Sequence, residues 1–183
     1  MPKRNVKRMC YAALLAAMYL PLSLYAAVQV GNVRISFGSL PVVAAALLFG
    51  PVDAVIVAMV GEFFKQLLTY GVTYTTALYL IPPALRGLVV GLGALALLSL
   101  RGQRLEERRM LCYAVCVVAA VCTTLGNTLV NWLDSVLMGY YFPGLILGDF
   151  VWRLIVGIIN AVVMSSLAIP LVKALRQRNA VSL

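Results

Sequence analysis

The chain has no histidine, only four cysteines and only six acidic residues among its 183 positions. A zinc or haem site needs clustered soft ligands, usually with histidine support, and that support is missing here. Cys10, Cys112, Cys116 and Cys122 all fall in apolar segments, where a free cysteine packs as a small hydrophobic residue. We therefore expect no metal and no cofactor.

Catalytic and nucleotide-binding motifs are also missing. The sequence contains no G-x-S-x-G motif, no repeated aspartates that could hold a catalytic metal, and no histidine to act as a base. These absences argue against an enzyme, so we expect no catalytic residues. The chain also lacks a G-x-x-x-x-G-K-[ST] motif and cannot itself be an ATPase of that type.

Charge is scarce, since 63% of the residues are hydrophobic and only 11% are charged, with a mean hydropathy of +0.97. Such values are typical of an integral membrane protein. Apolar segments cover residues 9–29, 36–50, 52–70, 79–100, 110–133 and 148–174. They predict an all-α protein with six transmembrane helices in a single domain, 1–183. The 36–50 segment is the weakest, because about 20 residues are needed to cross a bilayer.

The basic residues give the predicted topology. In a soluble protein, a net charge of +9 would suggest a nucleic-acid partner. Here, however, most lysines and arginines fall in three clusters, which are Lys3, Arg4, Lys7 and Arg8, then Arg101, Arg104, Arg108 and Arg109, then Lys173, Arg176 and Arg178. By the positive-inside rule, residues 1–8, 101–109 and 175–183 are cytoplasmic, which places both termini on that side of the plasma membrane. We expect no nucleic-acid partner.

Apart from Asp53, which lies near the cytoplasmic end of its helix, the ionisable residues outside the three basic clusters and the 101–109 loop gather in the outer half of the predicted bundle. Ionisable residues near a lipid-exposed helix centre cost about 2.5–3.5 kcal/mol, so they normally face a protein interior or a wet cavity. Cations, carboxylates, amides and aromatic rings at one level predict an outward-opening pocket for an aromatic, anionic small molecule. The predicted site residues are Arg34, Glu62, Lys65, Tyr70, Tyr74, Arg86, Asn127, Asn131, Trp132, Asp149 and Arg153.

Two alternatives to ligand binding stay open for these residues. Glu62 and Lys65 are spaced i,i+3, and Asp149 and Arg153 are spaced i,i+4, so each pair could simply be an intrahelical ion pair. The asparagines of the 127–131 stretch could equally hold two helices together.

The first helix is poor in polar groups and rich in alanine. Ala12 and Ala16, and likewise Ala13 and Ala17, have the small-xxx-small spacing that lets another helix approach closely in lipid. The alternative is packing within the protein itself.

Three stretches carry a family resemblance. The runs "ISFGSLPVVAAALLFGPVDAVIVAMVGE", "IPPALRGLVVG" and "NTLVNWL" resemble the substrate-binding S components of energy-coupling factor (ECF) vitamin transporters, over about residues 8 to 175. The "LFGP" and "NTLVNWL" stretches are most similar to folate-binding members. The third loop, "TYGVTYTTALYLIPPALRG", departs from those members because it lacks their Pro-Gly turn.

The resemblance implies both a ligand and partners. It implies an outward-facing vitamin pocket that includes Arg34, Tyr70, Tyr74, Arg86, Asn131, Asp149 and Arg153. It also implies that Ala12, Ala13, Ala16 and Ala17 face a membrane T component, and that two cytoplasmic ATPase subunits power uptake. Pantothenate, a queuosine precursor or another metabolite remains an alternative to folate. A stand-alone secondary transporter is a further alternative, although such proteins typically show inverted repeats and charges at the midplane.

Overall fold

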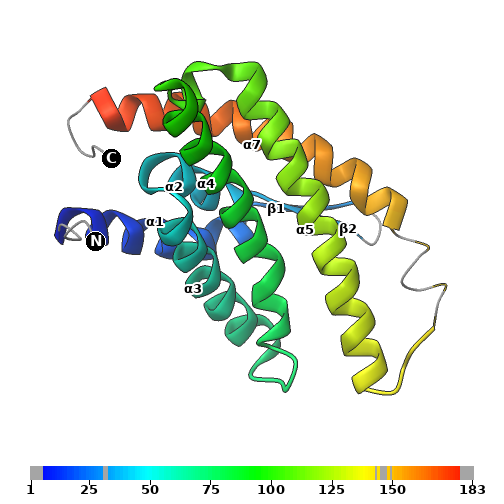
Figure 1. The fold of residues 1–183 in the computed structure, drawn as a ribbon. Helices are drawn as coiled ribbons and strands as arrows, with labels where there is room; N and C mark the ends of the chain where they lie inside the picture. Colours follow the sequence, from blue (N-terminus) through cyan, green and yellow to red (C-terminus); the bar gives the residue numbers. More distant parts are fainter. Residues whose placement is uncertain (1–5, 31–32, 143, 145–147, 149, 178–183) are drawn as a thin grey trace.

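The computed structural model describes residues 6–30, 33–142, 144, 148 and 150–177 (Figure 1). Within these residues it contains six α-helices, two short 3-10 helices and one β-hairpin. The α-helices are α1 (Val6–Leu24), α2 (Ser39–Phe49), α3 (Pro51–Tyr70), α4 (Ile81–Arg101), α5 (Arg109–Leu137) and α7 (Phe150–Gln177). The 3-10 helices are η1 (Leu78–Leu80) and η2 (Leu105–Glu107). The predicted all-α fold with six helices is confirmed.

The hairpin between α1 and α2 corrects the predicted helix boundaries. Strands β1 (Ala27–Val30) and β2 (Val33–Ser36) pair antiparallel, with Ala27 opposite Ser36. The prediction that the first helix reaches residue 29 and that the second begins at 36 is therefore wrong. The physical reason is that β-branched valine and isoleucine alternate with polar residues in both strands, a period-2 pattern that favours strand over helix.

Helix α2 forms the centre of the fold. Every residue of α2 except Leu40 is buried, and it packs against α1, α3, α4 and α7 (Figure 1). Its eleven residues are only about 16 Å long at 1.5 Å per residue, so it is too short to cross a bilayer alone. Gly50 has a φ of 88°, which ends α2, and Pro51 then starts α3.

Two arginines hold the C-terminal end of α2. Arg176 of α7 donates a hydrogen bond to the Leu47 carbonyl oxygen at 2.6 Å, and Arg8 of α1 donates one to the Phe49 carbonyl. Arg8 also forms an ion pair with Asp53, in the first turn of α3. Cations at a helix C-terminus complement its dipole. The first turn of α1 and the last turn of α7 therefore meet at one end of the bundle, as Figure 1 shows.

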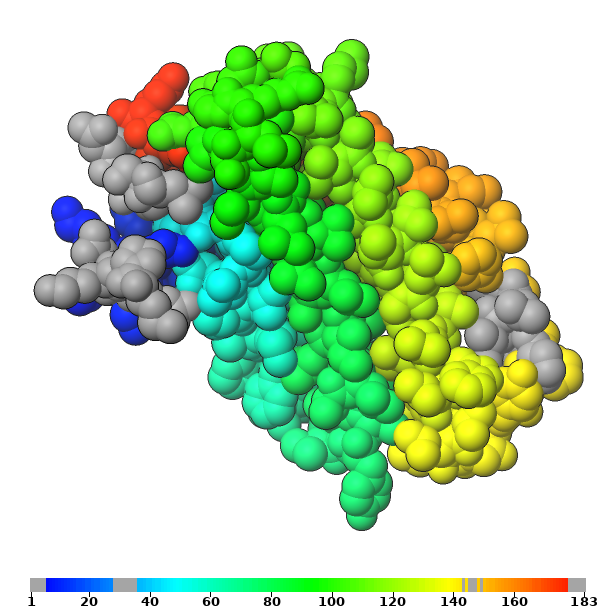
Figure 2. All heavy atoms as spheres, viewed as in Figure 1, coloured from blue at the N-terminus to red at the C-terminus, as the bar shows by residue number. Residues whose placement is uncertain are grey.

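In the described part of the chain, three helical segments are long and apolar enough to cross a membrane, namely Leu78–Arg101, Arg109–Leu137 and Phe150–Gln177. They also expose large apolar side chains, including Leu92, Leu125 and Leu129. Figure 2 shows α4 and α5 side by side, forming a continuous outer face of the molecule. An apolar outer surface of this kind is suited to contact with lipid chains.

The alanines of α1 divide into two sets. Ala12 and Ala16 pack against the hydrophobic core, whereas Ala13 and Ala17 are exposed. Of the two predicted small-xxx-small pairs, only Ala13 and Ala17 are thus available to a helix of another chain.

Candidate functional site

A cavity of about 780 Å³ lies inside the bundle. It is lined by the C-terminal halves of α3 and α5 and the N-terminal halves of α4 and α7. Arg8 pairs with Asp53 at the N-terminal end of α3, and Arg176 lies in the last turn of α7, so the cavity lies at the end of the bundle opposite these two arginines. Small-molecule sites typically have volumes of about 300–1,000 Å³.

Glu62 lies in the cavity wall, and it is only 4% exposed. Its Oε2 atom accepts a hydrogen bond from the Tyr19 hydroxyl at 2.6 Å. Its Oε1 atom accepts from Lys65 Nζ at 2.8 Å and from Gln66 Nε2 at 3.0 Å. Three donors from two helices thus satisfy the carboxylate, and the intrahelical pairing of Glu62 with Lys65 is present.

A glycine positions Tyr19 for this contact. A Cβ atom at Gly61 would lie 2.5 Å from Cγ of the Tyr19 ring, so only glycine lets α1 come this close to α3. The Tyr19 ring therefore lies over Gly61 and directs its hydroxyl to Glu62, the next residue.

Asp134 is the second carboxylate of the cavity wall, and it connects two loops. It accepts hydrogen bonds from Tyr79 in η1, at 3.1 Å, and from Tyr140, just after α5. The hydrogen bond to Asp134 raises the pKa of the Tyr140 hydroxyl, because it favours the protonated phenol. Asp134 thus joins the loop before α4 to the loop after α5 at the mouth of the cavity.

Two arginines and two asparagines in the wall have no such partners among the described residues. Arg86 of α4 and Arg153 of α7 make no hydrogen bond or ion pair to another residue that the structure describes. Within the same described ranges, Asn127 and Asn131 of α5 also make no side-chain hydrogen bond. These groups are therefore available to a ligand.

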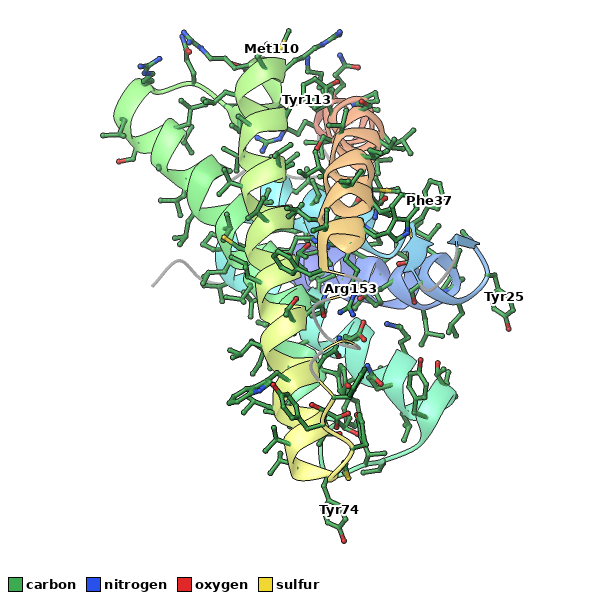
Figure 3. The ribbon with its side chains drawn as sticks, turned by 90° about the vertical axis from the view of Figure 1, so that its right-hand side faces the viewer. Tyr25, Phe37, Tyr74, Met110, Tyr113 and Arg153 are labelled. Atoms are coloured by element: carbon green, nitrogen blue, oxygen red, sulfur yellow. The ribbon has the colours of Figure 1, made fainter. Side chains whose placement is uncertain are left out.

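The structure brings most of the predicted site residues together. The cavity is lined by Glu62, Lys65, Tyr70, Arg86, Asn127, Asn131 and Arg153. Two others do not line it, since Tyr74 is fully exposed and Trp132 is 42% exposed on α5. Figure 3 shows Arg153 on the inner side of the bundle and Tyr74 at its tip, directed away from it. The backbone of Arg34 lies in β2, and Asp149 falls outside the described residues.

The cavity wall also contains residues that the sequence analysis did not predict, including Asp134, Tyr79, Tyr19, Ser39, Gln66 and Asn160. Asn160 had a recognisable signal, because it is an amide within an otherwise apolar helix. Tyr19 and Ser39 had none, since a tyrosine or serine in a membrane helix commonly bonds to the backbone or lies at the interface.

Comparisons with known proteins agree with this architecture. Residues 3–177 match the family model described as "ECF-type riboflavin transporter, S component". One similar solved structure is described as "Structure and mechanism of the S component of a bacterial ECF transporter". It has a TM-score of 0.63 and 20% sequence identity, over 93% of this chain and 96% of that chain. At this identity the match supports the fold. No curated protein sequence matches the chain.

Proposed function

Because the chain belongs to the family of ECF-type riboflavin transporter S components, we propose that its cavity captures an anionic vitamin, with folate as the first candidate. The protein is a multi-pass membrane protein of a vitamin transporter and not an enzyme. One observation carries the proposal for the ligand. The carboxylates of Glu62 and Asp134 are already paired, whereas the guanidinium groups of Arg86 and Arg153 have no hydrogen-bonding or ion-pair partner among the described residues.

Arginines that no described residue pairs favour a ligand with carboxylates. Folate carries two carboxylates that can pair with arginine, and charge-assisted hydrogen bonds of this kind are about twice as strong as neutral ones. Asn127 and Asn131 can bond to polar ring edges, and Tyr70 lies at the mouth where it can stack on a ring. Riboflavin is the second candidate, because the family description names it, but it is uncharged.

We expect Arg153→Gln to weaken folate binding by about 10- to 100-fold, since a hydrogen bond to a charged group contributes about 1.5–3 kcal/mol. Isothermal titration calorimetry on the purified full-length protein would measure this. Arg101→Gln is the matched control, because Arg101 is exposed at the opposite end of α4. Nanomolar riboflavin binding without folate binding would instead assign the cavity to the uncharged vitamin.

The cavity should open to the outside of the cell. The basic residues Arg8, Arg176 and Arg104 lie at the end of the bundle opposite the cavity, and the positive-inside rule assigns that end to the cytoplasm. We propose that the protein receives its vitamin outside. A T component and two cytoplasmic ATPase subunits then power its release inside.

The exposed alanines of α1 give a test of this assembly. Replacing Ala13 and Ala17 together by leucine should reduce uptake and co-purification of the T component by roughly tenfold or more, because the bulk prevents close helix approach. Ligand binding to the isolated protein should persist, since neither residue lines the cavity. Uptake of radiolabelled folate by cells expressing all four subunits would measure the effect.

Ala96→Leu is the matched control for this experiment, because Ala96 is an exposed alanine on α4. The Ala13 and Ala17 face would be excluded as the contact if the double variant assembled and transported as the control does.

A further inference from the structure

The loop between α4 and α5 has a strongly basic surface. Arg104, Arg108 and Arg109 lie close together in the sequence, and all three are exposed. The guanidinium groups of Arg104 and Arg109 have no hydrogen-bonding or ion-pair partner among the described residues, and that of Arg108 donates to Gln103 at 2.6 Å. We call these three residues the arginine rim. Their positive charge is not neutralised by the described part of the protein.

The two acidic residues of the loop do not cancel this charge. Glu106 is 3% exposed and pairs with Arg176 of α7, with 3.0 Å between Oε1 and Nε. Glu107 is exposed beside the rim. The loop surface thus presents three positive charges against one negative charge, which favours an anionic partner.

The loop is firmly attached to the bundle. Leu105, in η2, is 1% exposed and belongs to the main hydrophobic core. The ion pair of Glu106 joins η2 to the last turn of α7, and η2 also packs against α4 and α5. The arginines on either side of Leu105 therefore extend from a fixed base, so a partner need not order the loop in order to bind them.

The position of the rim fits the surface of a bilayer. Helix α4 ends and helix α5 begins at this loop, and both are long and apolar enough to cross a membrane. Leu100 and Met110, on the two sides of the loop, are each 84% exposed. Figure 3 shows Met110 at the end of the bundle opposite Tyr74. Exposed apolar side chains beside arginines match the boundary between acyl chains and headgroups, whereas a small soluble anion would leave them in water.

We propose that the arginine rim binds the phosphate of an anionic phospholipid in the cytoplasmic leaflet. Guanidinium groups bind phosphate oxygens through paired hydrogen bonds, and basic clusters at the cytoplasmic ends of membrane helices favour anionic lipids. Leu100 and Met110 contact the acyl chains next to the headgroup. Because α4 ends and α5 begins at this loop, the contact fixes the depth of both helices in the membrane. The lipid site lies at the end of the bundle opposite the vitamin cavity, so it does not depend on which vitamin binds.

Native mass spectrometry of the purified full-length protein in detergent would measure lipid binding. We expect phosphatidylglycerol to bind at least about tenfold more tightly than phosphatidylcholine with the same acyl chains, because each basic residue near an anionic membrane surface contributes about fivefold to binding. Replacing Arg104, Arg108 and Arg109 together by glutamine should bring the two lipids within about threefold of each other. Thermal melts should stay unchanged, since all three side chains are exposed.

The matched control removes the same number of charges from the N-terminal basic cluster, by replacing Lys3, Arg4 and Lys7 together with glutamine. This variant should keep the native preference within about threefold, so that a loss in the rim variant reports the rim and not the net charge. Replacing Leu100 and Met110 together by serine should weaken both lipids by a similar factor, because it removes contact with the acyl chains and no charge.

Three outcomes would overturn the lipid site. The first is equal binding of both lipids to the native protein, and the second is an unchanged preference in the rim variant. The third is binding of soluble glycerol 1-phosphate as tight as that of phosphatidylglycerol, which would mean that the rim holds a free phosphate group. An unchanged lipid preference together with lost co-purification of the ATPase subunits would assign the rim to a protein partner instead.

Discussion

Replacing Lys65 by methionine should destabilise the protein by about 3 kcal/mol, because it removes a charge partner from a buried carboxylate. Breaking a buried ion pair typically costs about 3–5 kcal/mol. We expect the lower end of this range, since Glu62 would keep its hydrogen bonds from Tyr19 and Gln66 and since the Lys65 side chain is 23% exposed. Thermal or denaturant unfolding of the ligand-free protein in detergent would measure the loss.

A double-mutant cycle of Lys65→Met and Glu62→Gln tests whether the two side chains stabilise each other. Glu62→Gln alone should also be destabilising, whereas Glu62→Gln in the Lys65→Met background should recover much of the stability, because the uncompensated charge is gone. Phe64→Met is the matched control, since Phe64 is exposed on the same helix. If Lys65→Met left the melting unchanged but abolished folate binding, Lys65 would instead belong to the ligand.

The charges of the sequence predicted the lining of the cavity better than its aromatic residues did. Glu62, Lys65, Arg86 and Arg153 line the cavity because an ionisable side chain in a membrane helix is stable only towards protein or water. Tyrosine and tryptophan are stable in the interface as well, so position along the helix could not decide which way Tyr74 or any similar ring points.

The sequence carries a signal for the hairpin between α1 and α2. "AVQVGNVRIS" contains two short runs in which β-branched residues alternate with polar ones, separated by Gly-Asn. This is a sequence pattern of a β-hairpin. The high hydropathy of the region favoured a continued helix instead, because apolar runs alone do not separate strand from helix.

Other features depend on packing and could not be predicted from one sequence. The contact of Tyr19 with Glu62 joins residues 43 positions apart and requires α1 to lie over Gly61. Similarly, the spacing of the alanines on α1 predicted two small faces but not which one turns inward. Helix α2 is buried on nearly all sides because it lies at the centre of the fold. Its own residues show only high hydropathy, which does not predict that central position.

Replacing Gly91 by alanine should also destabilise the protein by about 3 kcal/mol, near the upper end of what overpacking costs. A Cβ atom at position 91 would lie 2.4 Å from the Pro51 Cα atom, so the backbones of α3 and α4 would have to separate. Gly87 makes a similar approach to the Ala54 backbone, at 2.9 Å. The direction is diagnostic, because alanine in a helix interior is otherwise favoured over glycine by about 1 kcal/mol.

Gly93→Ala is the matched control on the same helix, since the added Cβ would meet the Val115 side chain and not a backbone. Thermal unfolding should therefore show a smaller loss of stability for Gly93→Ala than for Gly91→Ala.

Gly91→Ala should also change the affinity for the ligand, because α3 carries Glu62 and α4 carries Arg86 into one cavity. Separating the two helices would move these side chains apart, so Gly91→Ala should weaken folate binding although it lines no part of the cavity. An alanine at position 91 that raised the melting temperature would show that α3 and α4 do not pack as closely as this structure requires.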